Sequence, residues 1–426
     1  MPGFLDKELA WRSCSPRYQY IFVFDPLRRF ILQKVFPVQF TLGVLGNSLI
    51  FWVLTSDDAA NIASDLLAAV SLCDTMFLFM MVPHSLASFD GLAGMYHFRF
   101  FYIKTKQHMA AMANWMSAAA IWLILAVSLE RFLIVRSPLR SKLYWERGRM
   151  ALVLGSVFLI TGVLTIYHHF EYDCQMVSFC NGTQVMDFCY PTTEAHPAEF
   201  GSRIEYRPSK MVQLYIRSST FFNAVLVVLL PMVLVVVINI SLLRVLHKND
   251  QTLENGLLTS SLARTQQKTR RRVTATVAAI GLCFAITQGP SAVMAIWELV
   301  AGFDNVGPFF YKISSITNSL VVMGKSLNFV LFCLSSEHFR QKCLRSFART
   351  FPTLSRSVSR FSRHRSSARG SLQGGGSVHL RPQPGKIWIV LAICGVIYVS
   401  SLYFFSEFFY NAYSKKRSPT KAQKAE

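Results

Sequence analysis

Long runs of apolar residues alternate along this chain with short segments that carry charge. Five runs hold no charged residue: 35–56, 107–129, 150–170, 218–243 and 273–297. Two more, 66–89 and 313–336, are each interrupted by one charge, Asp74 in the first and Lys325 in the second. A helix needs about 20 residues to cross the hydrocarbon of a bilayer, and lipid offers a bare backbone no hydrogen-bond partner. The pattern therefore predicts seven membrane-spanning helices.

An eighth apolar run, 387–406, stands apart near the C-terminus. Basic residues flank it on both sides, so charge does not fix its direction across a membrane. We expect a membrane helix packed loosely beside the bundle; the alternatives are a membrane-surface helix and a segment joined from a neighbouring gene. The predicted fold class is thus an all-α membrane protein, a seven-helix bundle with an additional C-terminal hydrophobic helix over 387–409.

The composition supports a membrane protein. Of the 426 residues, 52% are apolar and only 16% are charged, whereas soluble domains carry about 25% charged residues. These values exclude a disordered protein, a secreted disulfide mini-domain and an ordinary cytosolic enzyme. A formal charge of +21 would suggest nucleic acid in a soluble protein, but basic loops beside an anionic lipid bilayer explain it here. We therefore expect no nucleic acid partner.

The distribution of Lys and Arg predicts the orientation. The loops after the third and fifth runs are strongly basic, while the segment 171–210 holds six acids against three bases. Basic loops stay in the cytoplasm, so we expect a multi-pass protein of the plasma membrane with its N-terminus outside. Asn181 lies in an Asn-Gly-Thr glycosylation acceptor, which is used only outside.

Cysteine usage follows from this topology. Four cysteines are expected outside, where disulfides persist: Cys14, Cys174, Cys180 and Cys189. Four cysteines allow three connectivities, and the sequence does not choose among them. Cysteines inside the spans, such as Cys73 and Cys283, are expected to be packing residues.

A set of motifs occurs in a fixed order along the seven runs. Glu130-Arg131 closes the third run, and Pro138 follows. Single residues mark the other runs: Asn47, Asp74, Pro231, Pro290 and Asn328. The ordered set over 31–348 resembles a rhodopsin-type (class A) G-protein-coupled receptor. Within that class, the stretches at 117–132, 167–172 and 326–329 are similar to invertebrate FMRFamide-like neuropeptide receptors. A divergent nematode-style chemosensory receptor would share much of the pattern.

The resemblance implies a role for the end of the third run. Glu130 and Arg131 would form an ionic switch, and Arg131 would be freed to meet a heterotrimeric G protein when the helices open. The alternative for an isolated pair is a base that snorkels at the lipid interface.

The resemblance also implies a central polar site. In such receptors the aspartate and the two asparagines, here Asp74, Asn47 and Asn328, line a sodium and water site. Lys325 lies three residues before Asn328 and so shares its helix face. A charge at mid-membrane costs about 3 kcal/mol or more and needs a partner. We hypothesise that the Lys325 ammonium replaces sodium and pairs with Asp74; the alternative is that Lys325 turns toward water.

Ile121, Pro231 and Phe284 match the family's connector between the ligand pocket and the cytoplasmic gate, although each alone is an ordinary core residue. Pro290 leaves a backbone carbonyl unpaired and kinks its helix, which provides a lever for an outward swing.

Three features depart from the resembled pattern. The sixth run has no aromatic toggle, and the seventh has Phe329 and Phe332 in place of proline and tyrosine. No cysteine occurs between Cys73 and Cys174. The usual disulfide from the third helix to the second outer loop therefore cannot form, and Lys106 occupies about the place of its cysteine.

The ligand side is predicted from charge. Peptides of the RF-amide type are cationic at arginine, so an acidic mouth would complement them. The candidates are acids and aromatics near the span ends: Glu171, Trp297, Glu298, Asp304 and Tyr311. The alternative is that acids at span ends are simply solvated.

The chain is predicted to divide into six segments. They are an extracellular N-terminus (1–30), a receptor bundle (31–334), an amphipathic juxtamembrane helix (335–348), an Arg/Ser-rich disordered tail (349–386), the extra helix (387–409) and a basic terminus (410–426). Cys343 is a palmitoylation candidate, with an unmodified thiol as the alternative. The tail serines suit receptor kinases, and phosphate there would recruit arrestin.

Two other classes fit less well. A transporter would show repeated halves and broken helices; no repeat is evident, and Asp74 with Lys325 is its main support. A membrane enzyme would need a motif such as His-Glu-x-x-His or Gly-x-Ser-x-Gly, and the sequence has neither. We expect a receptor that passes binding of an extracellular peptide to a G protein by helix rearrangement, with no enzymatic activity, cofactor or metal.

Overall fold

The computed structural model describes a subset of the chain, namely Cys14 and residues 21–55, 62–137, 147–193, 196–197, 205–206, 208–254, 281–297 and 308–335. The chain divides into two units, Met1–Phe329 and Val330–Glu426. Of the second unit, only the end of one helix is described. Several predicted features lie outside the described residues: Glu298, Asp304, Cys343 and all of 336–426.

The first span begins earlier than its apolar run. α2 (Pro26–Phe30) continues through the π-helical turn η2 (Ile31–Val35) into α3 (Phe36–Thr55). The Asp25 carboxylate accepts a 2.9 Å hydrogen bond from the backbone N–H of Arg28, and Pro26 follows this N-cap. A capping carboxylate and an N-terminal proline are typical helix starts. Capping, rather than hydropathy, thus sets this end, and the expected boundary at residue 30 falls inside the helix.

The third span also exceeds its apolar run. After α4 (Ile62–Leu86) and the short α5 (Asp90–Ala93), α6 runs from Tyr96 to Arg136. It begins before residue 107 because the charged side chains in its first turns have partners: Arg99, for example, is buried yet donates to a backbone carbonyl.

The remaining described helices follow in order. α8 (Arg147–Thr165) ends in the 3-10 turn η3 (Ile166–His169). α9 (Lys210–Phe222), the π-helical η4 (Asn223–Leu229) and α10 (Leu230–Glu254) form one continuous helix. A helix over Gly281–Trp297 and α12 (Pro308–Ser335) complete the set. Five of the described helices are long and apolar enough to cross a membrane, and Gly281–Trp297 is a shorter apolar helix.

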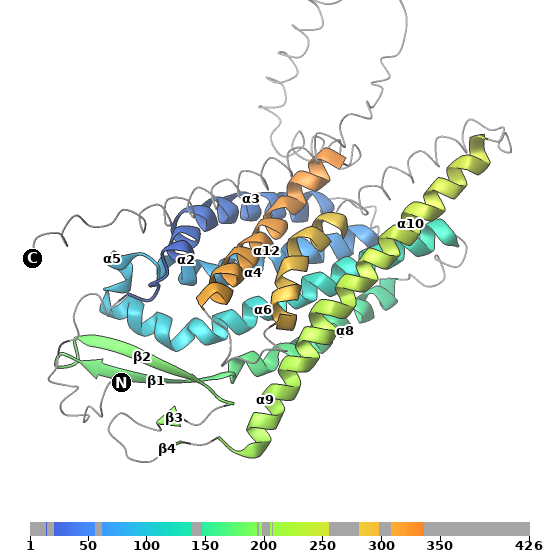
Figure 1. Cartoon of the computed structure of the whole chain (residues 1–426). Coiled ribbons are helices and arrows are strands. Elements are labelled where there is room, and N and C mark those ends of the chain that lie inside the picture. Colours follow the sequence, from blue (N-terminus) through green and yellow to red (C-terminus); the bar gives the residue numbers. More distant parts are fainter. Residues whose placement is uncertain are drawn as a thin grey trace, which may run out of the picture. The chain divides into compact units, whose positions relative to one another are not determined.

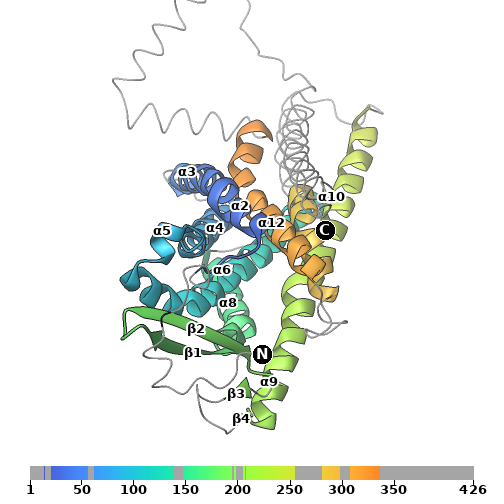
Figure 2. The ribbon, with the colours of Figure 1, turned by 60° about the vertical axis from the view of Figure 1, so that its left-hand side comes forward.

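A β-hairpin interrupts the otherwise helical chain. β1 (Tyr172–Phe179) pairs antiparallel with β2 (Gln184–Pro191), and β3 (His196–Pro197) pairs with β4 (Glu205–Tyr206). A search for long apolar runs misses such strands. Cys180, Asn181 and Gly182 have positive φ and form the tight turn between β1 and β2. The hairpin lies beside the first turns of α6 (Figures 1 and 2).

The core is shared by several helices. α4 packs against α3 and α6, and α6 also contacts α8 and α10 (Figure 1). One cluster of buried side chains draws on four helices, α3, α4, α6 and α12: Phe36, Phe77, Leu78, Ala113 and Val322. These contacts hold α4 and α6 at the centre of the described bundle.

Close backbone approach brings α12 against the helix Gly281–Trp297. A Cβ atom added at Gly324 would lie 2.8 Å from Thr287 Cβ and would also clash with its hydroxyl. Thr287 is itself buried, so it has little room to give way. Only glycine therefore fits at this crossing.

We expect Gly324→Ala to lower the melting temperature of the solubilised protein. Overpacking a filled contact costs about 1–3 kcal/mol, which outweighs the gain of about 0.5–1 kcal/mol when alanine replaces a helical glycine. Gly155→Ala in α8 is the matched control, because nothing lies within 4 Å of its added Cβ. Equal melting temperatures for the two variants would contradict the close approach.

Candidate functional site

A buried ion pair joins α4 to α12. Lys325 Nζ lies 2.9 Å from Asp74 Oδ1, and the side chains are only 5% and 2% exposed. Asn328 Nδ2 donates a 2.7 Å hydrogen bond to the other carboxylate oxygen, Oδ2. Both oxygens of Asp74 are therefore engaged by donors from α12.

The pair has two further neighbours. Asn47 Nδ2 on α3 donates a 3.2 Å hydrogen bond to the backbone carbonyl of Lys325. The Lys325 ammonium lies 4.7 Å from the centre of the Phe77 ring, a cation–π contact. The site thus links three helices, α3, α4 and α12. Removing either charge would leave the other buried and unpaired.

The arrangement does not fit the sodium ion that the resemblance implies at this position. A hard cation binds oxygen ligands, but both Asp74 oxygens already accept N–H donors. The Lys325 ammonium also brings its own positive charge to the carboxylate. The direct contact between Lys325 and Asp74 is the geometry hypothesised from helix periodicity; its effect on signalling stays a prediction.

The second candidate site is the Glu130–Arg131 pair, which lies near the C-terminal end of α6. Arg131 Nε is 3.2 Å from Glu130 Oε2, and Glu130 is almost fully buried. The two side chains thus form an ion pair inside the helical bundle rather than pointing freely into lipid or solvent. This is the geometry expected of a switch at rest, and the switching role stays a prediction.

The connector residues are all in or near the core. Ile121 and Phe284 are buried, as is Pro231, while Pro290 is half-buried. The helix continues through Pro290 to Trp297. Ordinary core residues would be placed in the same way, so the connector role also stays a prediction.

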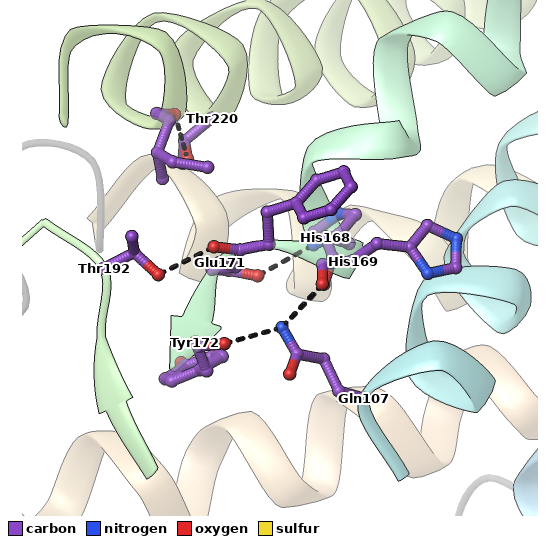
Figure 3. Close-up of polar contacts among 9 residues, drawn as sticks. Gln107, His168, His169, Glu171, Tyr172, Thr192 and Thr220 are labelled. Carbon is purple, nitrogen blue, oxygen red and sulfur yellow. Dashed lines mark hydrogen bonds and ion pairs between the residues drawn. The ribbon is translucent and has the colours of Figure 1, made fainter. Parts of the chain in front are cut away.

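Glu171 belongs to a polar network beside the hairpin (Figure 3). Its Oε2 lies 2.9 Å from His168 Nδ1. Gln107 Nε2 on α6 donates hydrogen bonds of 3.0 Å to the backbone carbonyls of His169 and Tyr172. Thr192 Oγ1 donates a 2.7 Å hydrogen bond to the backbone carbonyl of Phe170. Glu171 therefore has a partner in η3, and Gln107 joins η3 and the hairpin to α6.

The two described aromatic candidates are brought together by a residue that sequence reasoning missed. The Trp297 and Phe310 ring centres are 6.1 Å apart, and those of Phe310 and Tyr311 are 5.8 Å apart. Phe310 is buried, while Trp297 and Tyr311 are 50% and 59% exposed. They offer an aromatic surface where the helix Gly281–Trp297 ends and α12 begins.

The structure selects one of the three disulfide connectivities. Cys174 on β1 is bonded to Cys189 on β2, its direct cross-strand partner. Cys14 is bonded to Cys180 at the hairpin turn. Asn181 follows Cys180 and is exposed, and its glycosylation stays a prediction.

A further contact replaces the missing helix-to-loop disulfide. The Lys106 ammonium on α6 forms an ion pair with the carboxylate of Asp187 on β2. Sequence analysis singled out Lys106 because it stands where a cysteine is expected. It did not predict Asp187 as the partner, because that pairing depends on the register of a hairpin that was not predicted.

Comparison with known proteins places the chain in a class. A family model described as serpentine type 7TM GPCR chemoreceptor Srw matches residues 36–350. A Caenorhabditis elegans protein provisionally named G-protein coupled receptor F59B2.13 is 34% identical over 322 residues, which cover 74% of this chain and 72% of that protein. The chain is therefore a G-protein-coupled receptor and not an enzyme. Within that class it belongs to the Srw chemoreceptor family.

Two further similarities are weaker, one in identity and one in length. The mouse Neuromedin-U receptor 2 is 23% identical over 316 residues, or 72% of each chain. Long chain fatty acid elongase 2 of Caenorhabditis elegans is 56% identical over only 39 residues, 9% of this chain and 14% of the elongase. So short a match carries no conclusion about the receptor's activity.

The family model and the Caenorhabditis elegans receptor confirm the predicted receptor class and helical membrane fold.

We predict that sodium does not stabilise the wild-type receptor and that Lys325→Ser creates such an effect. Removing the ammonium leaves the Asp74 carboxylate unpaired beside Asn47 and Asn328, at a cost of about 3–5 kcal/mol, and a small cation then offsets part of that loss. The measurement is the melting temperature of solubilised receptor in NaCl and in N-methylglucamine chloride of equal ionic strength.

Lys312→Ser is the matched control, since Lys312 lies on the same helix and is only half-buried. It should leave the two melting temperatures equal. A wild-type receptor stabilised specifically by sodium, or a Lys325→Ser variant indifferent to it, would contradict the argument.

Proposed function

We propose that this receptor binds an extracellular peptide of the FMRFamide-like type and signals to a heterotrimeric G protein through the Arg131 end of α6. The observation that carries the proposal is the placement of two polar clusters well apart along one 41-residue helix. Gln107, which contacts the hairpin, lies within the first third of this helix, and the Glu130–Arg131 pair lies within its last two turns. A single continuous helix thus connects the two.

The proposed orientation has support from the disulfides. Four membrane spans lie between Cys14 and Cys180, so the two cysteines lie on the same side of a membrane, as their bond requires. Disulfides persist on the outer side. This argues for a plasma-membrane receptor with the N-terminus and hairpin outside and the Arg131 end facing the cytoplasm.

Two observations favour a peptide as the ligand. The mouse relative is by name a receptor for neuromedin U, and the outer segment 171–210 carries an excess of acidic residues, which complements a cationic peptide. Trp297 and Tyr311 add an exposed aromatic surface. The family description favours a second candidate, a chemosensory ligand from the environment.

The proposed mechanism is a shift between helix arrangements. Ligand binding outside favours the arrangement in which the Glu130–Arg131 pair opens, and a bound G protein reciprocally raises ligand affinity. The Asp74–Lys325 pair holds α4 against α12 during the change. Phosphorylation of the serines in 349–386 by receptor kinases, followed by arrestin binding, would end the signal.

The ligand proposal is tested by a screen on cells that express the chain. We expect peptides with an amidated Arg-Phe end to stimulate nucleotide exchange on a G protein in isolated membranes, and their non-amidated forms to be weaker because the added carboxylate meets an acidic surface. Responses only to small chemosensory compounds would support the second candidate instead. Uptake of a solute without nucleotide exchange would overturn the receptor mechanism.

The switch proposal is tested with Arg131→Ala. We expect ligand-stimulated nucleotide exchange to fall at least tenfold while ligand binding persists, since the change lies at the far end of α6 from the hairpin. Arg136→Ala is the control: Arg136 is an exposed arginine on the same helix and should retain exchange. Unchanged signalling by Arg131→Ala would refute the role.

A further inference from the structure

A line of basic side chains on α6 faces one strand of the hairpin. Arg99 and Lys106 are seven residues apart, about two helical turns, and so lie on one face of α6. Val185 and Asp187 are two residues apart on β2, which places them on one face of the strand. The two faces meet: Arg99 contacts Val185, and Lys106 contacts Asp187.

The contacts are largely shielded from water. Arg99 Nε donates to the carbonyl of Val185, and its whole residue is 3% exposed. The Lys106 ammonium pairs with the Asp187 carboxylate, and these side chains are 25% and 9% exposed. Salt screens a pair in such surroundings less than one on the surface. Added salt should therefore weaken this pair less than it weakens an exposed one.

Arg99 has contacts outside the hairpin as well. Its Nη1 donates to the carbonyl of Ala93, and its guanidinium lies 4.2 Å from the centre of the Phe22 ring. Arg99 would thus keep its place if the hairpin moved. Lys106 has no comparable second anchor among the contacts of the described residues, so its ion pair is the contact that follows the position of Asp187.

No covalent bond ties the hairpin to α6. Cys174–Cys189 lies within the hairpin, and Cys14–Cys180 joins it to the N-terminal segment. The sequence has no cysteine between Cys73 and Cys174, so α6 has none to offer. The hairpin is thus braced internally but held to α6 by reversible contacts.

We propose that the Lys106–Asp187 ion pair is a latch that holds the hairpin closed against α6 and can release it as one cross-linked body. Opening exposes both charges to water together, which costs far less than burying one of them alone. Under the receptor function proposed above, on which this consequence rests, release of the hairpin uncovers the outer end of α6 to an incoming ligand.

The latch is tested by a distance measurement that needs neither ligand nor G protein. Spin labels are placed at His97, exposed on α6, and Met176, exposed on β1, by chemistry that spares the native cysteines. The full-length receptor should show one dominant short distance. Lys106→Met and Asp187→Asn should each raise the population at longer distances at least tenfold.

Three control variants distinguish loss of the ion pair from a general disturbance of the structure. Lys104→Met removes a lysine two residues away whose ammonium lies over Phe100 of its own helix, and should leave the distances unchanged. Lys106→Arg keeps the charge and should stay closed. The exchange of charges, Lys106→Asp with Asp187→Lys, should restore the short distance.

The latch is wrong if Lys106→Met matches the wild type, or if the charge exchange stays as open as the single variants. Because these readouts involve no signalling, they stand whether or not the peptide screen succeeds. A closed hairpin in Lys106→Met together with a productive peptide screen would reject the latch and leave the receptor function standing.

Discussion

The requirement that a charge inside a membrane bundle be paired governs this structure. Asp74 on α4 and Lys325 on α12 would each cost several kcal/mol if buried alone in a membrane bundle, and their contact offsets part of that cost. The ion pair joins α4 to α12, and the carbonyl of Lys325 in turn accepts a hydrogen bond from Asn47 on α3. The paired charges thus lie at a point where α3, α4 and α12 are all joined by polar contacts.

α6 connects this core to both ends of the receptor. It packs against α4, α8 and α10 and also contacts the hairpin. At about 1.5 Å per residue, its 41 residues extend well beyond a bilayer about 30 Å thick. Its basic residues Arg99 and Lys106 lie in the extra turns before the apolar run, where they contact strands instead of lipid. The same helix therefore serves as a core element in its middle and as a docking surface at its start.

Apolar runs and helical periodicity were enough to predict much of the fold and part of the candidate site. They located the spans, and the three-residue spacing of Lys325 and Asn328 put both on the face that meets Asp74. They did not give the starts of the helices α2 and α6, which precede the first and third apolar runs, because hydropathy does not reflect the capping by Asp25 or the contacts of Arg99. The hairpin was missed for a related reason, since its short strands carry mixed polar and apolar residues. The partner of Lys106 and the pairing of four cysteines depend on strand register, which no local pattern specifies.

The bond between Cys14 and Cys180 has a consequence for biosynthesis. It closes a loop of 166 residues, which in the chain-entropy treatment is worth about 5 kcal/mol against unfolding. It also cannot form until four helices have been threaded into the bilayer and the hairpin has emerged. Oxidation of Cys14 by Cys180 is therefore a late event for so early a residue, and it reports that the chain has been made at least as far as the hairpin turn.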